Sequence, residues 1–315
     1  MFETAGLDAI VLEVGLGGRL DAANAVDADA ALVTSIALDH CEWLGSDVES
    51  IGREKAGIFR PGRPAIFGSP AMPASIQSSA DECGARLLKL GRDFSYTRQG
   101  SHTPQGDRWT WQGTASRLSD LPPPALVGEI QFDNAAAVLA VLESLSGRLP
   151  VDRAAVVRGL QNVRLPGRFQ IFNGLGGSGA EWIVDVAHNP AAARTLASQL
   201  AQRPPPDGSR GRSIAVCGIL GDKDIEGVVA ELHASFDEWI VAGLASARSV
   251  GEQALAQRLR NCGVKVSATA PSVLAACAAA DAVATHADRV VVFGSFLTVG
   301  PAIEWLQGQR LATSG

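Results

Sequence analysis

The chain has 315 residues, 46% of them hydrophobic, which is enough to form two domains with a core each. Its formal net charge is −6 at pH 7 and no block of Lys or Arg stands out, which argues against a nucleic-acid partner. Five scattered cysteines without a C-x-x-C pair argue against a disulfide framework or a zinc site. The sequence shows no signal peptide and no apolar run long enough to span a membrane. We therefore expect a cytoplasmic protein that does not enter the membrane.

The stretch 12–60 dominates the first half of the chain. Ile10–Leu12 and Ala31–Ile36 are short aliphatic runs that predict buried parallel strands. Glu13 and His40 follow these runs, and ligands of open α/β sheets bind at the carboxyl ends of the strands, so we expect the two side chains to stand side by side there. A single histidine at a strand end is usually a surface residue, but a carboxylate and an imidazole together suit Mg²⁺.

A glycine turn follows Glu13, in the order Gly15, Gly17 and Gly18. Its spacing does not match G-x-G-x-x-G, which disfavours a nicotinamide dinucleotide site. A tight turn alone explains the glycines but not the charged residues at its ends. We therefore expect Arg19 and Asp21 to point into one crevice.

The segment Ser46–Ile58 predicts a helix, with Ser46 as its N-cap and Glu49 at the capping-box position. Glu54 and Lys55 lie in its last turns. On composition alone these two residues are an ordinary solvated charged pair.

Further elements follow in a regular order. An antiparallel ribbon is expected over 93–117, where Trp109 and Trp111 are more typical of a core than of a ligand platform. The remaining predicted elements of this half are a strand at 63–68, a helix at 73–84, a strand at 86–90, and helices at 129–145 and 152–161.

Pro166 and Gly167 interrupt the pattern, and from there strands and helices alternate cleanly. The sequence therefore predicts two domains, 1–166 and 167–315. The second is expected to be a Rossmann-like, doubly wound sheet. Its first strand ends at Asp185 within the run 185–190.

Five motifs in this order resemble the bacterial bifunctional dihydrofolate synthase/folylpolyglutamate synthases, members of the Mur ligase superfamily. They are LEVGLGGRLDAAN (12–24), TSIALDH (34–40), REKAGIFR (53–60), LPGRFQ (165–170) and DVAHNP (185–190). The resemblance covers essentially the whole chain. It implies an α/β fold with a Mur-ligase-type central ATP-binding domain, mostly parallel with a small antiparallel ribbon, and a Rossmann-like C-terminal glutamate-ligase domain.

The resemblance implies ATP-driven amide formation in folate biosynthesis and one-carbon metabolism, with ATP and Mg²⁺ as cofactors. The carboxylate of dihydropteroate, or of a folate glutamate tail, would become an acyl phosphate that the amine of L-glutamate attacks. Such ligases are commonly monomers.

By motif, the resemblance also assigns roles to residues. Glu13 and His40 would hold Mg²⁺, and Lys55 would be the lysine that such ligases carbamylate, which replaces a repelled ammonium by oxygen ligands. Lys55, His40 and Arg168 would be catalytic, with Arg168 suited to a developing phosphoryl charge. The implied nucleotide contacts are Asn134, Arg168, Asp185 at the ribose and His188, and the implied pterin-site residues are Arg19, Leu20, Asp21 and Ala22.

The sequence departs from the family pattern at two points. Ala23 stands where the family usually has Thr, which affects fine positioning. No phosphate-binding G-x-x-x-x-G-K-[ST] pattern occurs, although the family has one that should precede residue 1. We therefore expect an incomplete central domain and little ligase activity from this chain alone.

Two alternatives remain open at this stage. One is a muramyl-type ligase acting on a nucleotide-sugar peptide, which the wording of 12–24 and 53–60 disfavours. The other is a non-catalytic remnant that binds a pterin or a nucleotide. Binding without turnover would distinguish the remnant from a ligase.

Overall fold

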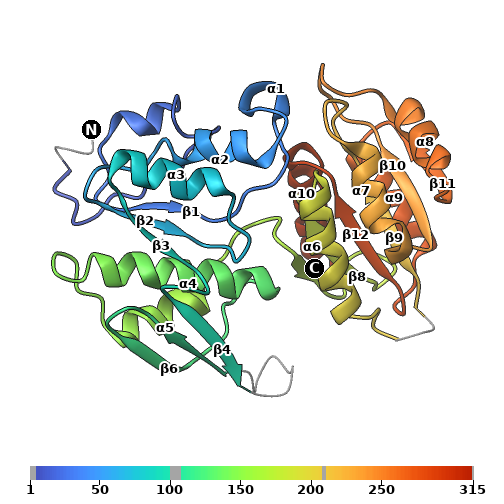
Figure 1. Cartoon of the computed structure of the whole chain (residues 1–315). Helices are drawn as coiled ribbons and strands as arrows, with labels where there is room; N and C mark the ends of the chain where they lie inside the picture. The colour runs from blue at the N-terminus through green and yellow to red at the C-terminus, as the bar shows by residue number, and fades with distance from the viewer. Residues whose placement is uncertain (1–4, 100–107, 208–210, 314–315) are drawn as a thin grey trace. The chain divides into compact units, whose positions relative to one another are not determined.

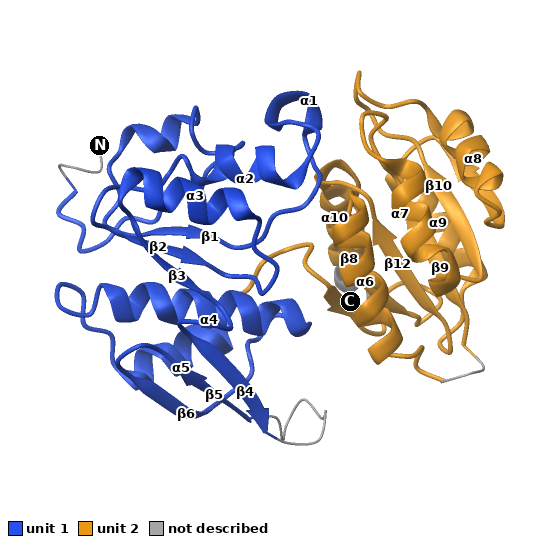
Figure 2. Ribbon diagram, in the orientation of Figure 1, with its two compact units in different colours: residues 1–163 blue, residues 164–315 orange. Residues whose placement is uncertain are grey.

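The computed structural model describes residues 5–99, 108–207 and 211–313. The chain divides into two compact units, residues 1–163 and 164–315 (Figure 2), and each is described by itself. The predicted boundary was 166/167. No helix of the described residues is both long and apolar enough to cross a membrane.

The first unit is built on a short parallel sheet in the order β1 (Ala31–Val33), β2 (Pro64–Phe67) and β3 (Arg86–Lys89). Helices α2 (Val48–Ala56) and α3 (Ala74–Cys83) lie on one face, and α4 (Glu129–Ser144) lies on the other (Figure 1). The remaining elements are η1 (Ala22–Ala25), α1 (Cys41–Leu44) and α5 (Arg153–Asn162), with the antiparallel strands β4 (Ser95–Gln99), β5 (Arg108–Gln112) and β6 (Arg117–Leu121).

The central strand β2 supplies both hydrophobic cores of this unit. Ala65 and Phe67 pack with residues of α2 and α3, whereas Ile66 packs on the opposite face with residues of α4 and the antiparallel strands. This division follows from the two-residue period of a strand. Trp109 and Trp111 are fully buried in the second core, as predicted.

The predicted strand at Ile10–Leu12 is wrong. These residues form no regular secondary structure, and Val11 is 95% exposed. An aliphatic run becomes a buried parallel strand only when neighbouring strands bind its backbone. Among the described residues, β1 is hydrogen-bonded only to β2, and it ends at Val33, before the expected Ile36.

The predicted helix cap is also corrected. Asp47, not Ser46, caps α2, because its carboxylate accepts the Ser50 N–H at 2.8 Å. Glu49 does not close a capping box; its two oxygens accept the N–H groups of Ala74 and Ser75 at 3.0 and 2.6 Å. The N-cap of α3 is Pro73, which has no acceptor side chain, so Glu49 supplies it from the neighbouring helix.

The second unit is the doubly wound sheet that the sequence predicts. Its strand order is β11 (Val266–Ala270), β10 (Glu238–Ala242), β9 (Ser213–Cys217), β12 (Arg289–Phe293), β8 (Glu181–Asp185) and β7 (Gln170–Phe172). All pairs are parallel except β7 with β8, and β7 was not predicted.

Helices cover both faces of this sheet. The core on one face contains residues of α6 (Pro190–Gln202), α7 (Ile225–Leu232) and α8 (Glu252–Asn261). The core on the other contains residues of α9 (Val273–Val283) and α10 (Phe296–Thr313), and the short helix η3 (His233–Ser235) follows α7.

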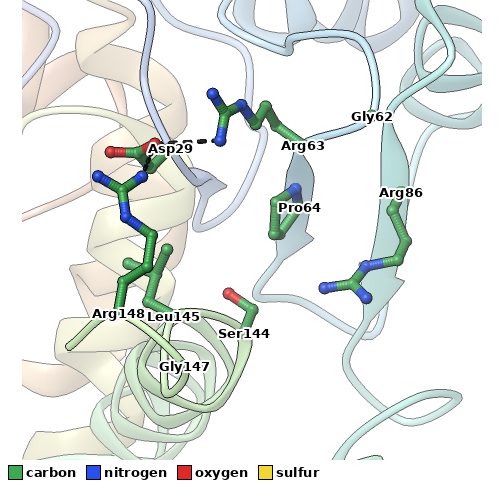
Figure 3. A pocket seen from close by; sticks show the side chains of 9 residues that line it. All are labelled: Asp29, Gly62, Arg63, Pro64, Arg86, Ser144, Leu145, Gly147 and Arg148. Carbon is green, nitrogen blue, oxygen red and sulfur yellow. Dashed lines mark hydrogen bonds and ion pairs between the residues drawn. The ribbon is translucent and has the colours of Figure 1, made fainter. Parts of the chain in front are cut away.

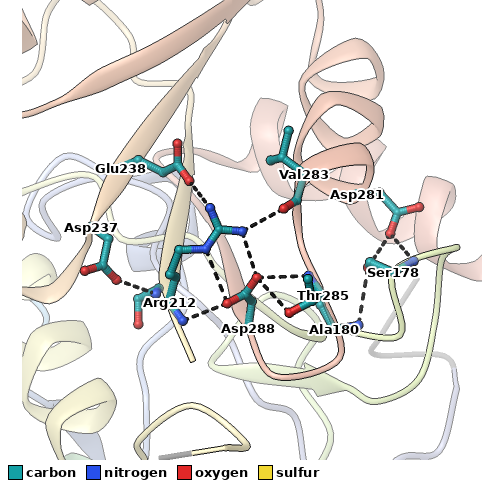
Figure 4. A network of polar contacts seen from close by, with 10 residues as sticks. Ser178, Ala180, Arg212, Asp237, Glu238, Asp281, Val283, Thr285 and Asp288 are labelled. Carbon is teal, nitrogen blue, oxygen red and sulfur yellow. Dashed lines mark hydrogen bonds and ion pairs between the residues drawn. The ribbon is translucent and has the colours of Figure 1, made fainter. Parts of the chain in front are cut away.

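A polar network ties together the amino ends of three strands of this sheet (Figure 4). Arg212 binds Glu238 and Asp288 at 2.9 Å each, and Asp237 accepts the Ser213 N–H at 2.8 Å. The network therefore satisfies polar groups at the edge opposite the carboxyl ends of the strands. Because the Arg212 guanidinium is paired within the fold, we interpret this network as structural.

Replacement of Leu139 on α4 tests whether this helix is packed in the core of the first unit. Its exposed neighbour Val138 provides a matched control. Leu139 is 4% exposed and Val138 is 48% exposed. We expect Leu139→Ala to lower the free energy of unfolding by about 2–4 kcal/mol, and Val138→Ala by less than about 0.5 kcal/mol. Urea denaturation followed by tryptophan fluorescence measures both. Equal losses would show that α4 does not bury the Leu139 face.

Candidate active site

The glycine turn after Glu13 is closed by one carboxylate. Oδ2 of Asp21 accepts the N–H groups of Gly15 and Leu16, both at 3.0 Å, and Oδ1 accepts that of Ala23 at 2.8 Å. These bonds, that of Ala23 above all, lower the pKa of Asp21. Asp21, predicted as a pterin-site residue, thus fixes the backbone of the segment that would receive the substrate.

This turn rests on the last residues of α2. The Arg19 N–H donates to the carbonyl of Glu54 at 2.9 Å, and its guanidinium forms an ion pair with the Glu54 carboxylate, also at 2.9 Å. Glu54 therefore pairs with Arg19 and not with Lys55, contrary to the simple reading of the two adjacent charges. Gly57 is required by this contact, since a Cβ there would lie 2.5 Å from the Arg19 Cβ.

Hydrogen bonds of Asn24 and Arg60 hold the motifs 12–24 and 53–60 together. The Asn24 amide donates to the carbonyls of Arg19 and Gly57, both at 3.1 Å. Arg60 in turn donates to the carbonyl and side-chain oxygens of Asn24 at 2.8 and 2.9 Å, and it pairs with Asp27. The motifs 12–24 and 53–60 are therefore one structural piece, held by residues that the sequence analysis did not single out.

His40 and Lys55 are brought to a common carboxylate. His40, in a left-handed conformation with φ 53°, begins α1, and its Nε2 lies 3.9 Å from Oδ1 of Asp39. Burial lowers the pKa of the Lys55 ammonium, whereas the charge of Asp39 acts in the opposite direction. Asp39, which the sequence analysis did not assign a role, thus faces two predicted metal ligands.

Glu13 is not tied to this group by any bond. Its side chain is exposed, and in the part of the chain that the structure describes its carboxylate makes no hydrogen bond or ion pair. No cluster of three or more His, Cys, Asp and Glu side chains suited to a metal occurs among the described residues. A carboxylate and an imidazole, joined by carbamate oxygens were Lys55 modified, would nevertheless fit a hard cation that keeps several oxygen ligands from water or phosphate.

The other predicted residues of this unit are less constrained. Leu20 is 80% exposed and Ala22 is exposed. Asn134, in the second turn of α4, donates to the Gln131 side chain at 3.2 Å. Beside it, burial raises the pKa of Asp133, which accepts a hydrogen bond from Tyr96 at 3.0 Å.

In the second unit, Asp185 joins the motifs 165–170 and 185–190. Its two oxygens accept the N–H groups of Phe169 and Ala187, both at 2.8 Å. Burial raises the pKa of Asp185 despite these bonds and the nearby charges of Arg168 and His188. A carboxylate has about four acceptor positions, so this role leaves capacity for the predicted ribose contact.

Arg168 and His188 flank this carboxylate. Nδ1 of His188 lies 2.8 Å from the carbonyl oxygen of Val186, which can only accept, so Nδ1 carries the proton and Nε2 is the acceptor in the neutral ring. The exposed Arg168 guanidinium lies over the Phe296 ring, 5.9 Å from its centre. Asn189 caps α6 by accepting the Ala192 N–H at 2.9 Å, with Pro190 in its first turn.

Gly167 allows the turn that carries Arg168 to approach α10 closely. Its φ is +71°, and a Cβ there would lie 2.5 Å from Val299 Cγ1. Gly174 has a similar φ of +64° but open space around it, so it is a matched control. We expect Gly174→Ala to destabilise by about 1–2 kcal/mol from backbone strain alone, and Gly167→Ala by distinctly more. Thermal denaturation measures the midpoint of each variant. Equal shifts in the two midpoints would mean that the turn can move away from Val299 without loss of stability.

Comparison with known proteins agrees with the geometry of both units. Residues 167–296 match the Mur ligase glutamate ligase domain family. The dihydrofolate synthase/folylpolyglutamate synthase of Escherichia coli K12 is 43% identical over 310 residues, covering 98% of this chain and 68% of the relative. A Mycobacterium tuberculosis protein of the same name is 33% identical, over 81% of this chain and 53% of its own length.

Solved structures give the same result. E. coli FolC in complex with DHPP and ADP matches with a TM-score of 0.82 and 43% identity, covering 94% of this chain and 66% of that one. A bifunctional folylpolyglutamate synthase/dihydrofolate synthase with Mn, AMPPNP and L-glutamate bound matches with a TM-score of 0.83 and 44% identity, covering 97% of this chain and 68% of that one. The chain thus spans about two thirds of the length of these E. coli and Mn-bound relatives. These matches do not favour the muramyl-type alternative. Nucleotide and divalent-metal binding are properties of these relatives, and the chain belongs to the dihydrofolate synthase/folylpolyglutamate synthase family of ATP-dependent Mur ligases.

Proposed function

We propose that this chain takes part in the ATP-driven addition of L-glutamate to dihydropteroate and to the glutamate tails of folates. The observation that carries the proposal is the joining of the family motifs in pairs. Asn24 and Arg60 unite 12–24 with 53–60, and Asp185 unites 165–170 with 185–190. Relatives that share these motifs are named for this reaction.

The proposed chemistry begins when the substrate carboxylate attacks the γ-phosphorus of ATP and ADP leaves. The glutamate amine then attacks the carbonyl carbon of the acyl phosphate, and the tetrahedral intermediate expels inorganic phosphate. Arg168, which is exposed and next to the turn that Asp185 fixes, would balance the phosphoryl charge. Asn134, Asp185 and His188 would hold the nucleotide, and Arg19 to Ala22 the pterin.

Lys55 is proposed to act as a carbamate. Its amine must lose a proton before it can attack CO₂, and burial lowers its pKa toward that state. The product carries a negative charge and two oxygens. Together with His40 and Glu13, these oxygens would hold Mg²⁺, which when bound would offset the charge of the phosphates.

Three finer points belong to the same proposal. We infer Mg²⁺ as the working ion, although a relative binds Mn. We infer a cytoplasmic location, because none of the five cysteines forms a disulfide. A monomer is inferred from the resemblance, because ligases of this kind are commonly monomers.

The proposed reaction predicts phosphate release that requires dihydropteroate, L-glutamate, ATP and Mg²⁺ together. The assay measures released phosphate for this chain and for a version extended upstream. Arg168→Gln is expected to lower turnover by about 10²-fold or more, because charge stabilisation in the transition state is lost. Its matched control is Arg158→Gln on the exposed face of α5, which should have no effect.

Two outcomes of this assay are decisive. Turnover by the extended chain supports the ligase. Nucleotide or pterin binding by both versions with turnover by neither would replace the ligase by the binding remnant.

The Lys55 proposal predicts a pH dependence. Because its pKa is lowered, the neutral amine and hence the carbamate should persist to lower pH than for an ordinary lysine. Carbon-13 NMR with labelled bicarbonate should show one carbamate resonance that is absent in Lys55→Arg and retained in Lys89→Arg. A resonance that survives Lys55→Arg would rule out this lysine as the modified residue.

A further inference from the structure

A basic hollow lies at the amino ends of the parallel strands of the first unit, away from the edge that carries the candidate active site. It measures about 270 Å³ and is open to solvent. Its lining residues come from the starts of β2 and β3, from the loop before β1 and from the turn after α4: Asp29, Gly62, Arg63, Pro64, Arg86, Ser144, Leu145, Gly147 and Arg148 (Figure 3).

Two of the three arginines that line this hollow bind one carboxylate. Arg63 and Arg148 both bind Oδ1 of Asp29, at 3.1 and 2.6 Å, and Figure 3 shows both guanidinium groups pointing toward it. One oxygen thus serves two cations. The lining carries three positive charges against one negative charge, in a chain whose net charge is −6.

Arg86 is the least engaged of the three. Its guanidinium makes no hydrogen bond or ion pair with any residue in the described part of the chain, although its backbone is held in the β2–β3 register. Arg86 extends from β3 on the far side of Pro64 from Asp29 (Figure 3). The lining therefore presents one unpaired guanidinium, that of Arg86, and two that share a single acceptor.

We propose that this hollow binds a phosphate group, held by Arg86 together with Arg63 and Arg148. A guanidinium presents N–H donors in a planar fork that matches phosphate oxygens, and a dianion would neutralise the two surplus charges. The volume suits a small phosphate-bearing molecule and not a nucleic-acid strand. This site is separate from the proposed active site, and it does not depend on the proposed function.

The simplest competing explanation is structural, with the arginines serving only to pair with Asp29. Both ion pairs are substantially exposed, with 47–71% of each side chain accessible, and such pairs stabilise a fold little. This explanation also does not account for Arg86, which does not pair with Asp29. The two explanations differ in what removal of the Asp29 charge should do.

Calorimetric titration of the whole chain with inorganic phosphate tests the proposal. Arg86→Gln should weaken binding by about tenfold or more through loss of a charge-assisted contact. Asp29→Asn should strengthen binding several-fold, because it frees Arg63 and Arg148, while the thermal midpoint stays the same or falls. The matched control is Arg117→Gln, an exposed arginine of the same unit on β6, which should bind as the parent does.

Further arms identify the source of the phosphate and the place where it binds. Titration with glycerol phosphate beside inorganic phosphate distinguishes a phosphate ester from free phosphate, and either preference supports the site. Arg168→Gln, in the second unit, should leave the titration unchanged. Loss of binding in Arg168→Gln, no loss in Arg86→Gln, no gain in Asp29→Asn, or the absence of saturable binding to the parent chain would each overturn the proposal.

Discussion

A carboxylate that accepts two or more backbone N–H groups is the interaction on which both candidate loops depend. Asp21 closes the glycine turn in this way, and Asp185 joins the turn of Arg168 to the segment after β8. Irregular loops leave many backbone N–H groups without partners, and an aspartate satisfies several of them at once. The same device has opposite electrostatic results. Hydrogen bonds dominate at the partly exposed Asp21 and lower its pKa, whereas burial dominates at Asp185 and raises it.

The position of the functional groups follows from these anchors. Arg19 lies between the Asp21 turn and Glu54, and Asn24 lies between that turn and Arg60. A loop held at so many points keeps its exposed residues, such as Leu20, in one place without burying them. A loop that is already ordered loses less conformational entropy when it binds a ligand. The polar contacts around Leu20 would therefore favour ligand binding even though the Leu20 side chain takes part in none of them.

Much of the second unit could be predicted because its central strands β8, β9, β10 and β12 are buried on both faces. Such strands appear in the sequence as continuous apolar runs, which is why β9, β10 and β12 were predicted within a few residues. Ile10–Leu12 carries the same signal, yet it is exposed, since a run of apolar residues does not reveal whether a neighbouring strand binds it. The short edge strand β7 carries too few residues for any periodicity.

The candidate site was predictable only in its parts. Predicted strand ends singled out Glu13, His40 and Asp185 as candidates, although the strand before Glu13 does not form. The contact of Asn24 with Arg60 joins residues 36 positions apart, so no local sequence pattern reveals it. Glu49 is a similar case, because a capping-box pattern within α2 does not show that the side chain caps α3. Side-chain partners across elements are set by tertiary packing, so sequence spacing alone assigns them wrongly.

Lys55 illustrates how one physical effect can serve chemistry and also limit it. Burial makes the ammonium costly and so favours the neutral amine, the form that can attack CO₂. Asp39 acts against this effect, because its charge stabilises the ammonium. If Lys55 is carbamylated as proposed, the sign of the interaction would reverse, and Asp39 would face another anion. A cation at His40 would then relieve that repulsion, so modification and metal binding should each strengthen the other.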